Sequence, residues 1–105
     1  MDNTQFNEIS IAFLEDWAEK IEAADSKFQL DVEYADGILN IEIEATGQQY
    51  VINKHEASKQ IWLSSPFSGA GRFSLKSERW IDSKNRDLET VIISEFKDKL
   101  EIALS

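Results

Sequence analysis

The feature that most constrains the fold is a repeated alternation of apolar and polar residues in short segments. Successive side chains of a β-strand point to opposite faces, so each alternating segment predicts a strand with one apolar and one polar face. The segments are 28–34, 38–44, 50–54, 59–64, 71–76 and a shorter one at 78–82. Such strands form an antiparallel sheet that is buried on one side only. We therefore expect five or six strands, the first of which directs Phe28, Leu30, Val32 and Tyr34 into the core.

Helical periodicity flanks these strands on both sides. Between residues 4 and 24, apolar residues recur at spacings of three and four, which places them on one helical face. They are Phe6, Ile9, Phe13, Trp17, Ile21 and Ala24. Asn3 and Thr4 are equally suited to cap this helix, and Asp87 is suited to cap a second apolar helix over 88–100. Two helices on one face of an antiparallel sheet predict an α+β two-layer sandwich, with residues 1–105 as a single domain.

Charge is distributed unevenly along the chain. Residues 1–50 hold twelve Asp/Glu and two Lys, a net charge of −10, whereas residues 51–105 hold eight Asp/Glu and nine Lys/Arg, a net charge of +1. The first half would repel nucleic acid and attract cations or a basic protein surface. No apolar run is long enough to cross a bilayer, so we expect no membrane partner. The acidic start MDNTQFNEIS is unlike a targeting peptide, which predicts a bacterial cytoplasmic or a mature organellar matrix protein.

Many of these acids share one predicted surface. Glu8, Glu15, Glu19 and Glu22 fall within roughly 60° on the polar side of the first helix. Asp16 lies off that stripe, beside the buried face, Asp25 comes just after the helix, and Asp31 and Glu33 follow on the first strand. Carboxylate oxygens suit Fe²⁺, Mn²⁺, Ca²⁺ or Mg²⁺, and an open site without imidazole or thiolate would bind them weakly. The alternative is a solvated helix face that only keeps the protein soluble.

A second candidate surface surrounds Trp62. In segment 59–64, Ile61 and Leu63 point to the core, so Trp62 stands on the polar face with Gln60. A tryptophan among short polar groups is typical of an interface anchor, although it could equally pack over outward neighbours such as Val51. His55 is predicted to lie in a surface loop. The chain has no cysteine, phosphate loop or nucleophile elbow, so we predict no catalytic residues and no enzyme.

The run VINKHEASKQIWLSSPFSGAGRF, together with the acidic first helix and the Asp36-Gly37 hairpin, resembles the frataxin family, including its bacterial CyaY branch. The resemblance covers essentially the whole chain, although His55 and Ala57 stand where the family commonly has Gln and Pro. It implies weak Fe²⁺/Fe³⁺ binding on an acidic ridge, which here comprises Glu15, Asp16, Glu19, Glu22, Asp25, Asp31 and Glu33. It also implies a partner-binding sheet-face patch, which here comprises Asn53, Gln60, Trp62 and Arg72.

The resemblance further implies a role in iron–sulfur cluster assembly, with a cysteine desulfurase and its scaffold protein as partners. We expect a monomer, with an iron-dependent oligomer as an alternative state. The competing function is that of a ferroxidase or iron-storage protein, although dedicated ferroxidase centres usually contain Glu-x-x-His pairs and this sequence has none. A third interpretation is a plain acidic adaptor that binds no metal.

Overall fold

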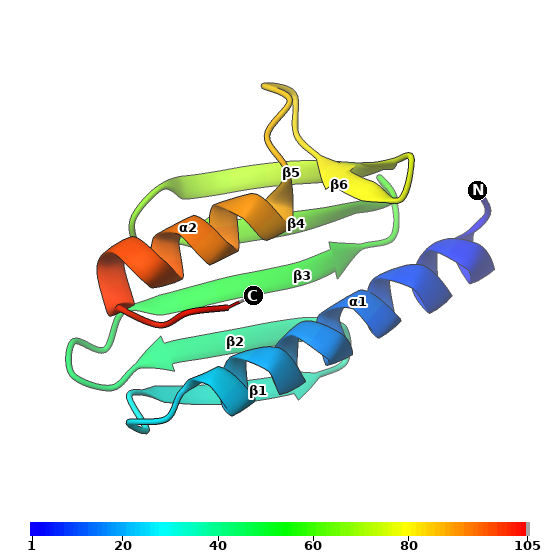
Figure 1. The fold of residues 1–105 in the computed structure, drawn as a ribbon. Coiled ribbons are helices and arrows are strands. Elements are labelled where there is room, and N and C mark those ends of the chain that lie inside the picture. Colours follow the sequence, from blue (N-terminus) through cyan, green and yellow to red (C-terminus); the bar gives the residue numbers. More distant parts are fainter. Residues whose placement is uncertain (105) are drawn as a thin grey trace.

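A computed structural model describes residues 1–104 (Figure 1). Along the chain, six strands lie between two helices, which is the larger of the two predicted strand numbers and the predicted order of elements. The elements are α1 (Asn3–Ala24), β1 (Leu30–Ala35), β2 (Ile38–Ile43), β3 (Gln49–His55), β4 (Gln60–Ser65), β5 (Gly69–Lys76), β6 (Arg79–Ile81) and α2 (Leu88–Leu100). Neither helix is long and apolar enough to span a membrane.

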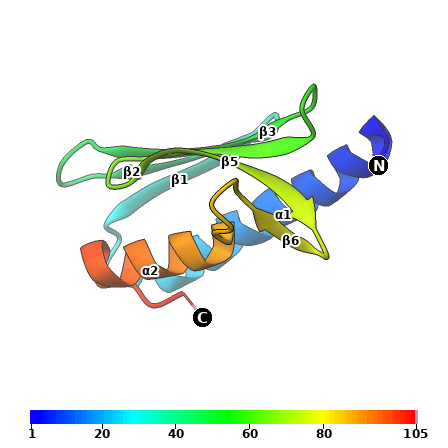
Figure 2. The same ribbon diagram turned by 90° about the horizontal axis from the view of Figure 1, so that it is seen from above.

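The six strands form one antiparallel meander in the order β1-β2-β3-β4-β5-β6. Figure 2 shows both helices beneath the same face of this sheet, and the other face is left open. Alternate residues of β2, β3 and β4 are buried, among them Ile41, Ile52 and Ile61, whose side chains are fully covered. The predicted α+β two-layer sandwich is confirmed.

Helix α1 differs in detail from the prediction. Neither Asn3 nor Thr4 is its N-cap, because Asp2 accepts a hydrogen bond from the Gln5 backbone and the Gln5 side chain accepts one from the Asp2 backbone. This reciprocal capping box satisfies two N–H groups that would otherwise lack partners. The buried face is also rotated from the predicted one: it includes Leu14, whereas Ile9 is 41% exposed.

The first strand begins two residues later than predicted. Phe28 was expected to point into the core, but it has a left-handed φ of 52° and is 84% exposed. The cause lies in Asp25, whose two carboxylate oxygens accept the backbone N–H groups of Gln29 and Leu30, both at 2.9 Å. These two hydrogen bonds turn the chain tightly after α1, so the pairing of β1 with β2 begins only at Leu30.

The β1–β2 hairpin has the turn that its sequence predicts. Asp36 and Gly37 have φ values of 51° and 76°, as a two-residue turn with both central residues left-handed requires. A side chain at Gly37 would also collide with Lys54, whose Cε lies 2.7 Å from the position that a Cβ would occupy. Lys54 Nζ donates to Asn7 Oδ1 at 3.0 Å, which ties β3 to α1.

Helix α2 packs through the predicted apolar band, and the chain then returns to the core. Leu88, Ile92 and Phe96 are at most 1% exposed. Glu101 takes a left-handed φ of 56°, and its N–H bonds to the carbonyl of Phe96. This reversal buries Ile102 and Leu104, which periodicity did not assign to the core.

Candidate functional site

The acidic ridge lies at the edge of the sandwich where α1 packs beside the edge strand β1. Glu15, Glu19 and Glu22 are exposed and form no hydrogen bond or ion pair within residues 1–104. Burial and the negative charge of Glu15 raise the pKa of Tyr34 on β1, which shows that α1 and β1 share one electrostatic environment. Helix α1 therefore lies against β1 as predicted, although Tyr34 faces the helical side of that strand whereas Asp31 and Glu33 face the other side.

The ridge acids do not converge on one point. Asp31 and Glu33 are exposed on the open face of β1, whereas the acids of α1 lie on the helical side, so the ridge wraps around the sheet edge. Within residues 1–104, no three acids or imidazoles lie close enough together to form a ready-made metal centre. Asp16 also has a partner four residues on, Lys20, at 3.0 Å. The edge thus provides dispersed oxygen ligands, as expected for weak binding of hydrated cations.

Asp25 differs from the other ridge members. It is only 7% exposed, and both of its oxygens accept the backbone N–H bonds that turn the chain into β1. These bonds give Asp25 a structural role that the sequence analysis missed. Its role as an iron ligand stays a prediction, and it is the least accessible of the seven carboxylates.

The open sheet face adds one acid that the predicted ridge omitted. Glu42 on β2 pairs across the ladder with Asp31 on β1. With Glu33, Asn40 and Gln49, these side chains line a shallow depression of about 260 Å³. The sequence carried this signal, because Glu42 alternates with buried residues of its strand, but only the strand register places it beside Asp31.

The sheet-face patch is built around a partly covered tryptophan. Trp62 was expected to stand exposed, but the His55 ring stacks on it at 3.8 Å with an interplanar angle of 10°. The Arg72 guanidinium lies over the same ring at 4.6 Å. Trp62 Nε1 donates to Gln60 Oε1 at 3.1 Å, so the indole has a hydrogen-bond partner as well as two stacking partners. The interpretation that Trp62 packs over its outward neighbours is therefore partly correct, with His55 and Arg72 as the neighbours that stack on it.

Strand register explains how the patch comes together. Asn53 lies opposite Trp62, and Trp62 lies opposite Arg72 on the next strand. His55 was expected in a loop but is the last residue of β3, where it faces outward and pairs with Gln60. Its position was recoverable, because residues 51, 53 and 55 share a face if the predicted strand is extended by one residue. The four predicted partner-binding residues thus lie together, with His55 as an unforeseen fifth.

Comparison with known proteins gives one consistent family. Residues 1–102 match the family model of the frataxin-like domain. A mitochondrial frataxin homologue of Saccharomyces cerevisiae is 45% identical over 69 residues, and mitochondrial frataxin of Caenorhabditis elegans is 39% identical over 71 residues. Each alignment covers 66% of this chain but only 39% and 52% of the respective relative, so the matched segments span about half of those proteins or less.

Solved structures agree with the fold. Frataxin from Psychromonas ingrahamii superimposes with a TM-score of 0.86 over 100% of this chain and 97% of that one, at 18% identity. A trimeric yeast frataxin, complexed with ferrous iron, gives a TM-score of 0.75 at 33% identity and covers 85% of this chain and 82% of its own. The first similarity shows the fold alone, and the second is to a relative that was solved in complex with ferrous iron.

Proposed function

Because this chain belongs to the frataxin family, we propose that it binds Fe²⁺ or Fe³⁺ weakly along the acidic ridge and modulates a cysteine desulfurase–scaffold complex that builds iron–sulfur clusters. The observation that carries the proposal is the row of exposed carboxylates where α1 meets β1, of which Glu15, Glu19 and Glu22 have no partner among the described residues. The yeast relative complexed with ferrous iron supports the choice of metal.

The ridge geometry suits transient iron binding. Its oxygen ligands are dispersed over a helix and the open face of a strand, so an ion would keep several waters. Carboxylate oxygens alone select poorly among Fe²⁺, Mn²⁺ and Mg²⁺, and occupancy would then follow metal availability. Weak binding is compatible with passing an ion to another protein, because exposed ligands impose little barrier to its release.

The acidic ridge and the sheet-face patch would each bind a different partner. The ridge would attract a basic surface of the desulfurase by long-range electrostatics. The sheet-face patch would pack against the scaffold, with Trp62 as the anchor already held by His55 and Arg72. An anchor that is ordered before binding loses less side-chain entropy on association.

The test is a pull-down with purified desulfurase and scaffold, with and without Fe²⁺, together with an NMR titration by Fe²⁺. We expect capture of the complex and paramagnetic broadening centred on residues 15–33 and on Glu42 beside them. Failure to capture either partner would exclude the regulatory role. Broadening spread evenly over all exposed acids would exclude the ridge as the iron site.

Dioxygen uptake distinguishes the proposal from the ferroxidase alternative. We expect no uptake stoichiometric with added Fe²⁺, because the sequence lacks Glu-x-x-His pairs. Rapid uptake followed by mineral in an oligomer would instead favour iron oxidation and storage.

A further inference from the structure

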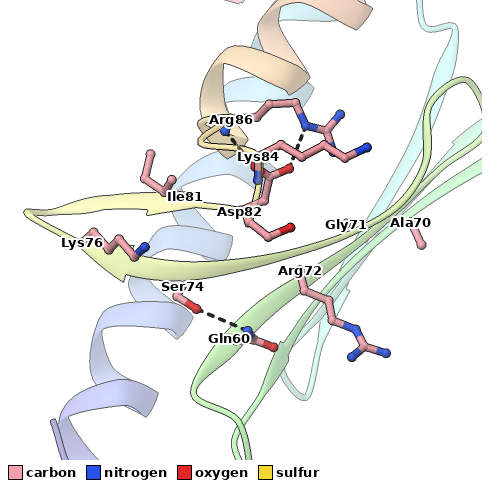
Figure 3. A pocket seen from close by; sticks show the side chains of 11 residues that line it. Gln60, Ala70, Gly71, Arg72, Ser74, Lys76, Ile81, Asp82, Lys84 and Arg86 are labelled. Carbon is pink, nitrogen blue, oxygen red and sulfur yellow. Dashed lines mark hydrogen bonds and ion pairs between the residues drawn. The ribbon is translucent and has the colours of Figure 1, made fainter.

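A hollow of about 460 Å³ opens between β5 and the loop that follows β6 (Figure 3). Gln60 and Ser74 line it from the sheet, joined by a hydrogen bond of 3.2 Å from Gln60 Nε2 to Ser74 Oγ. The charged groups around it are mainly cationic. We call this site the basic hollow, after its cationic side chains Arg72, Lys76, Lys84 and Arg86.

The loop that supplies two of these cations is held in place from inside. Asp82 is 7% exposed, and its carboxylate accepts the backbone N–H groups of Lys84 and Arg86 at 2.9 and 2.7 Å. It also accepts Arg86 Nε at 2.7 Å. The acid that lines the hollow is therefore already satisfied, and its hydrogen bonds fix the backbone from which Lys84 and Arg86 project.

Among the described residues, three of the four cations around the hollow have no anionic partner, and the fourth, Arg86, is only partly engaged. Within residues 1–104, no carboxylate forms an ion pair with Arg72, Lys76 or Lys84, and Arg86 bonds Asp82 through Nε alone. Its two terminal guanidinium nitrogens have no hydrogen-bond partner in that part of the chain. Oxyanions are the groups that such donors bind best, since guanidinium geometry matches carboxylate and phosphate.

The protein is strongly acidic overall, so the distance from the acidic ridge matters. Strand β5 lies four places from β1 in the sheet, which corresponds to roughly 19 Å at about 4.8 Å per strand. The Debye length is about 8 Å at physiological ionic strength. An anion in the hollow would thus feel the nearby cations far more than the ridge.

We propose that the basic hollow binds a small polyanion that carries phosphate or carboxylate groups. Its volume lies within the range of about 300–1,000 Å³ that small-molecule sites occupy. Gln60 and Ser74 would form hydrogen bonds with the ligand, and the cationic side chains would neutralise its charge. Because Arg72 also lies over Trp62, an occupied hollow would border the sheet-face patch.

The test is an amide NMR titration of the folded protein with pyrophosphate and, separately, with citrate, against sodium chloride at equal ionic strength. We expect shift changes grouped in residues 71–76 and 82–86. The variant Lys76→Gln/Lys84→Gln should weaken binding by roughly tenfold, given the modest value of each exposed charge contact. The matched control Lys27→Gln/Lys97→Gln removes the same charge elsewhere and should change the affinity by less than about twofold.

The two probes separate the two sources of oxyanion. Pyrophosphate binding alone would assign the hollow to phosphorylated ligands, citrate binding alone to polycarboxylates, and binding of both to oxyanions in general. Scattered shifts, equal losses in the two double variants, or no localised shift with either probe would overturn the proposal. The iron and partner assays do not involve Lys76 or Lys84, so the failure of one proposal is distinguishable from failure of the other.

Discussion

The carboxylates at the two edges of the sheet differ in whether they are already engaged in hydrogen bonds. On the α1–β1 side, Glu15, Glu19 and Glu22 are exposed and have no partner within residues 1–104. On the β5–β6 side, Asp82 is buried under hydrogen bonds, and Asp87 accepts a hydrogen bond from the Arg79 guanidinium at 2.8 Å. The contrast teaches that net charge alone does not identify a binding site. The useful distinction is whether a carboxylate still has accessible oxygens.

Glu95 on α2 is a further carboxylate whose oxygens are already engaged in hydrogen bonds. Its carboxylate accepts hydroxyl hydrogen bonds from Tyr50 at 3.0 Å, Ser65 at 2.6 Å and Ser68 at 2.5 Å. Burial and the Glu95 charge raise the pKa of Tyr50 well above its usual range. Such an acid holds α2 to β3 and to the loop after β4, so we expect it to contribute stability rather than ligand binding.

The largest effect should follow reversal of the unpaired acids. Glu19→Lys/Glu22→Lys would place like charges against both iron and a basic partner, and it should weaken desulfurase association on the order of a hundredfold at low salt. Titration calorimetry for iron and interferometry for the desulfurase measure the two losses. Glu78→Lys/Asp98→Lys is the matched control, because both acids are exposed and lie outside the ridge. Equal losses in both variants would mean that only net charge matters.

The next effect concerns the anchor of the sheet-face patch. Trp62→Ala should weaken scaffold binding roughly thirtyfold, as truncation of an aromatic hot spot does. It should also lower the Tm by several degrees, because the stacking partners His55 and Arg72 lose their contact. Ile9→Ala is the control and should leave scaffold affinity unchanged, since Ile9 is 41% exposed but lies on α1, away from the open face. Scaffold affinity that stays at the wild-type level would exclude Trp62 from the interface.

Much of the fold was predictable because it follows from periodicity. Alternation specified which faces of the strands are buried, and Asp36-Gly37 specified a turn that only left-handed residues can make. The errors arose where side chains bond to the backbone. Asp2, rather than Asn3 or Thr4, is the cap because it exchanges hydrogen bonds with Gln5, and the spacing of three residues between Asp2 and Gln5 was a signal for this capping box that the prediction did not use.

The candidate sites were less predictable, because they depend on register and tertiary contacts. The sequence identified the acids of the ridge, but it could not show that Asp25 is buried beneath the backbone of the following turn. It placed Trp62 on the polar face, but the His55 stack requires β3 to extend through His55. Periodicity assigns residues to a face, whereas three-dimensional contacts decide which of them remain free to bind a partner.

A smaller effect, on stability alone, is expected when an acid that already has hydrogen-bond partners is replaced. Glu95→Gln would remove the charge that accepts three hydroxyl groups and should cost about 1–2 kcal/mol of unfolding free energy. Urea denaturation measures this loss, and a spectrophotometric titration should show the Tyr50 pKa falling toward its usual value. Asp98→Asn lies one turn further along α2 and is exposed, so it should change neither quantity. An unchanged Tyr50 titration would contradict the proposed contact between Glu95 and the Tyr50 hydroxyl.

The smallest effect is the acid sensitivity of the loop after β6. Burial tends to raise the pKa of Asp82, but hydrogen bonds from Arg86 and Lys84 outweigh it and lower that pKa. A lowered folded-state pKa adds stability above the unfolded value of about 3.9, and this stability is lost as pH falls through the folded-state pKa. The Tm advantage of the wild type over Asp82→Asn should therefore be full at neutral pH and shrink in acid. Ser83→Ala, in the same turn but without a titrating group, should differ from the wild type equally at every pH. An Asp82→Asn difference that is independent of pH would mean that the loop is held by packing rather than by the carboxylate charge.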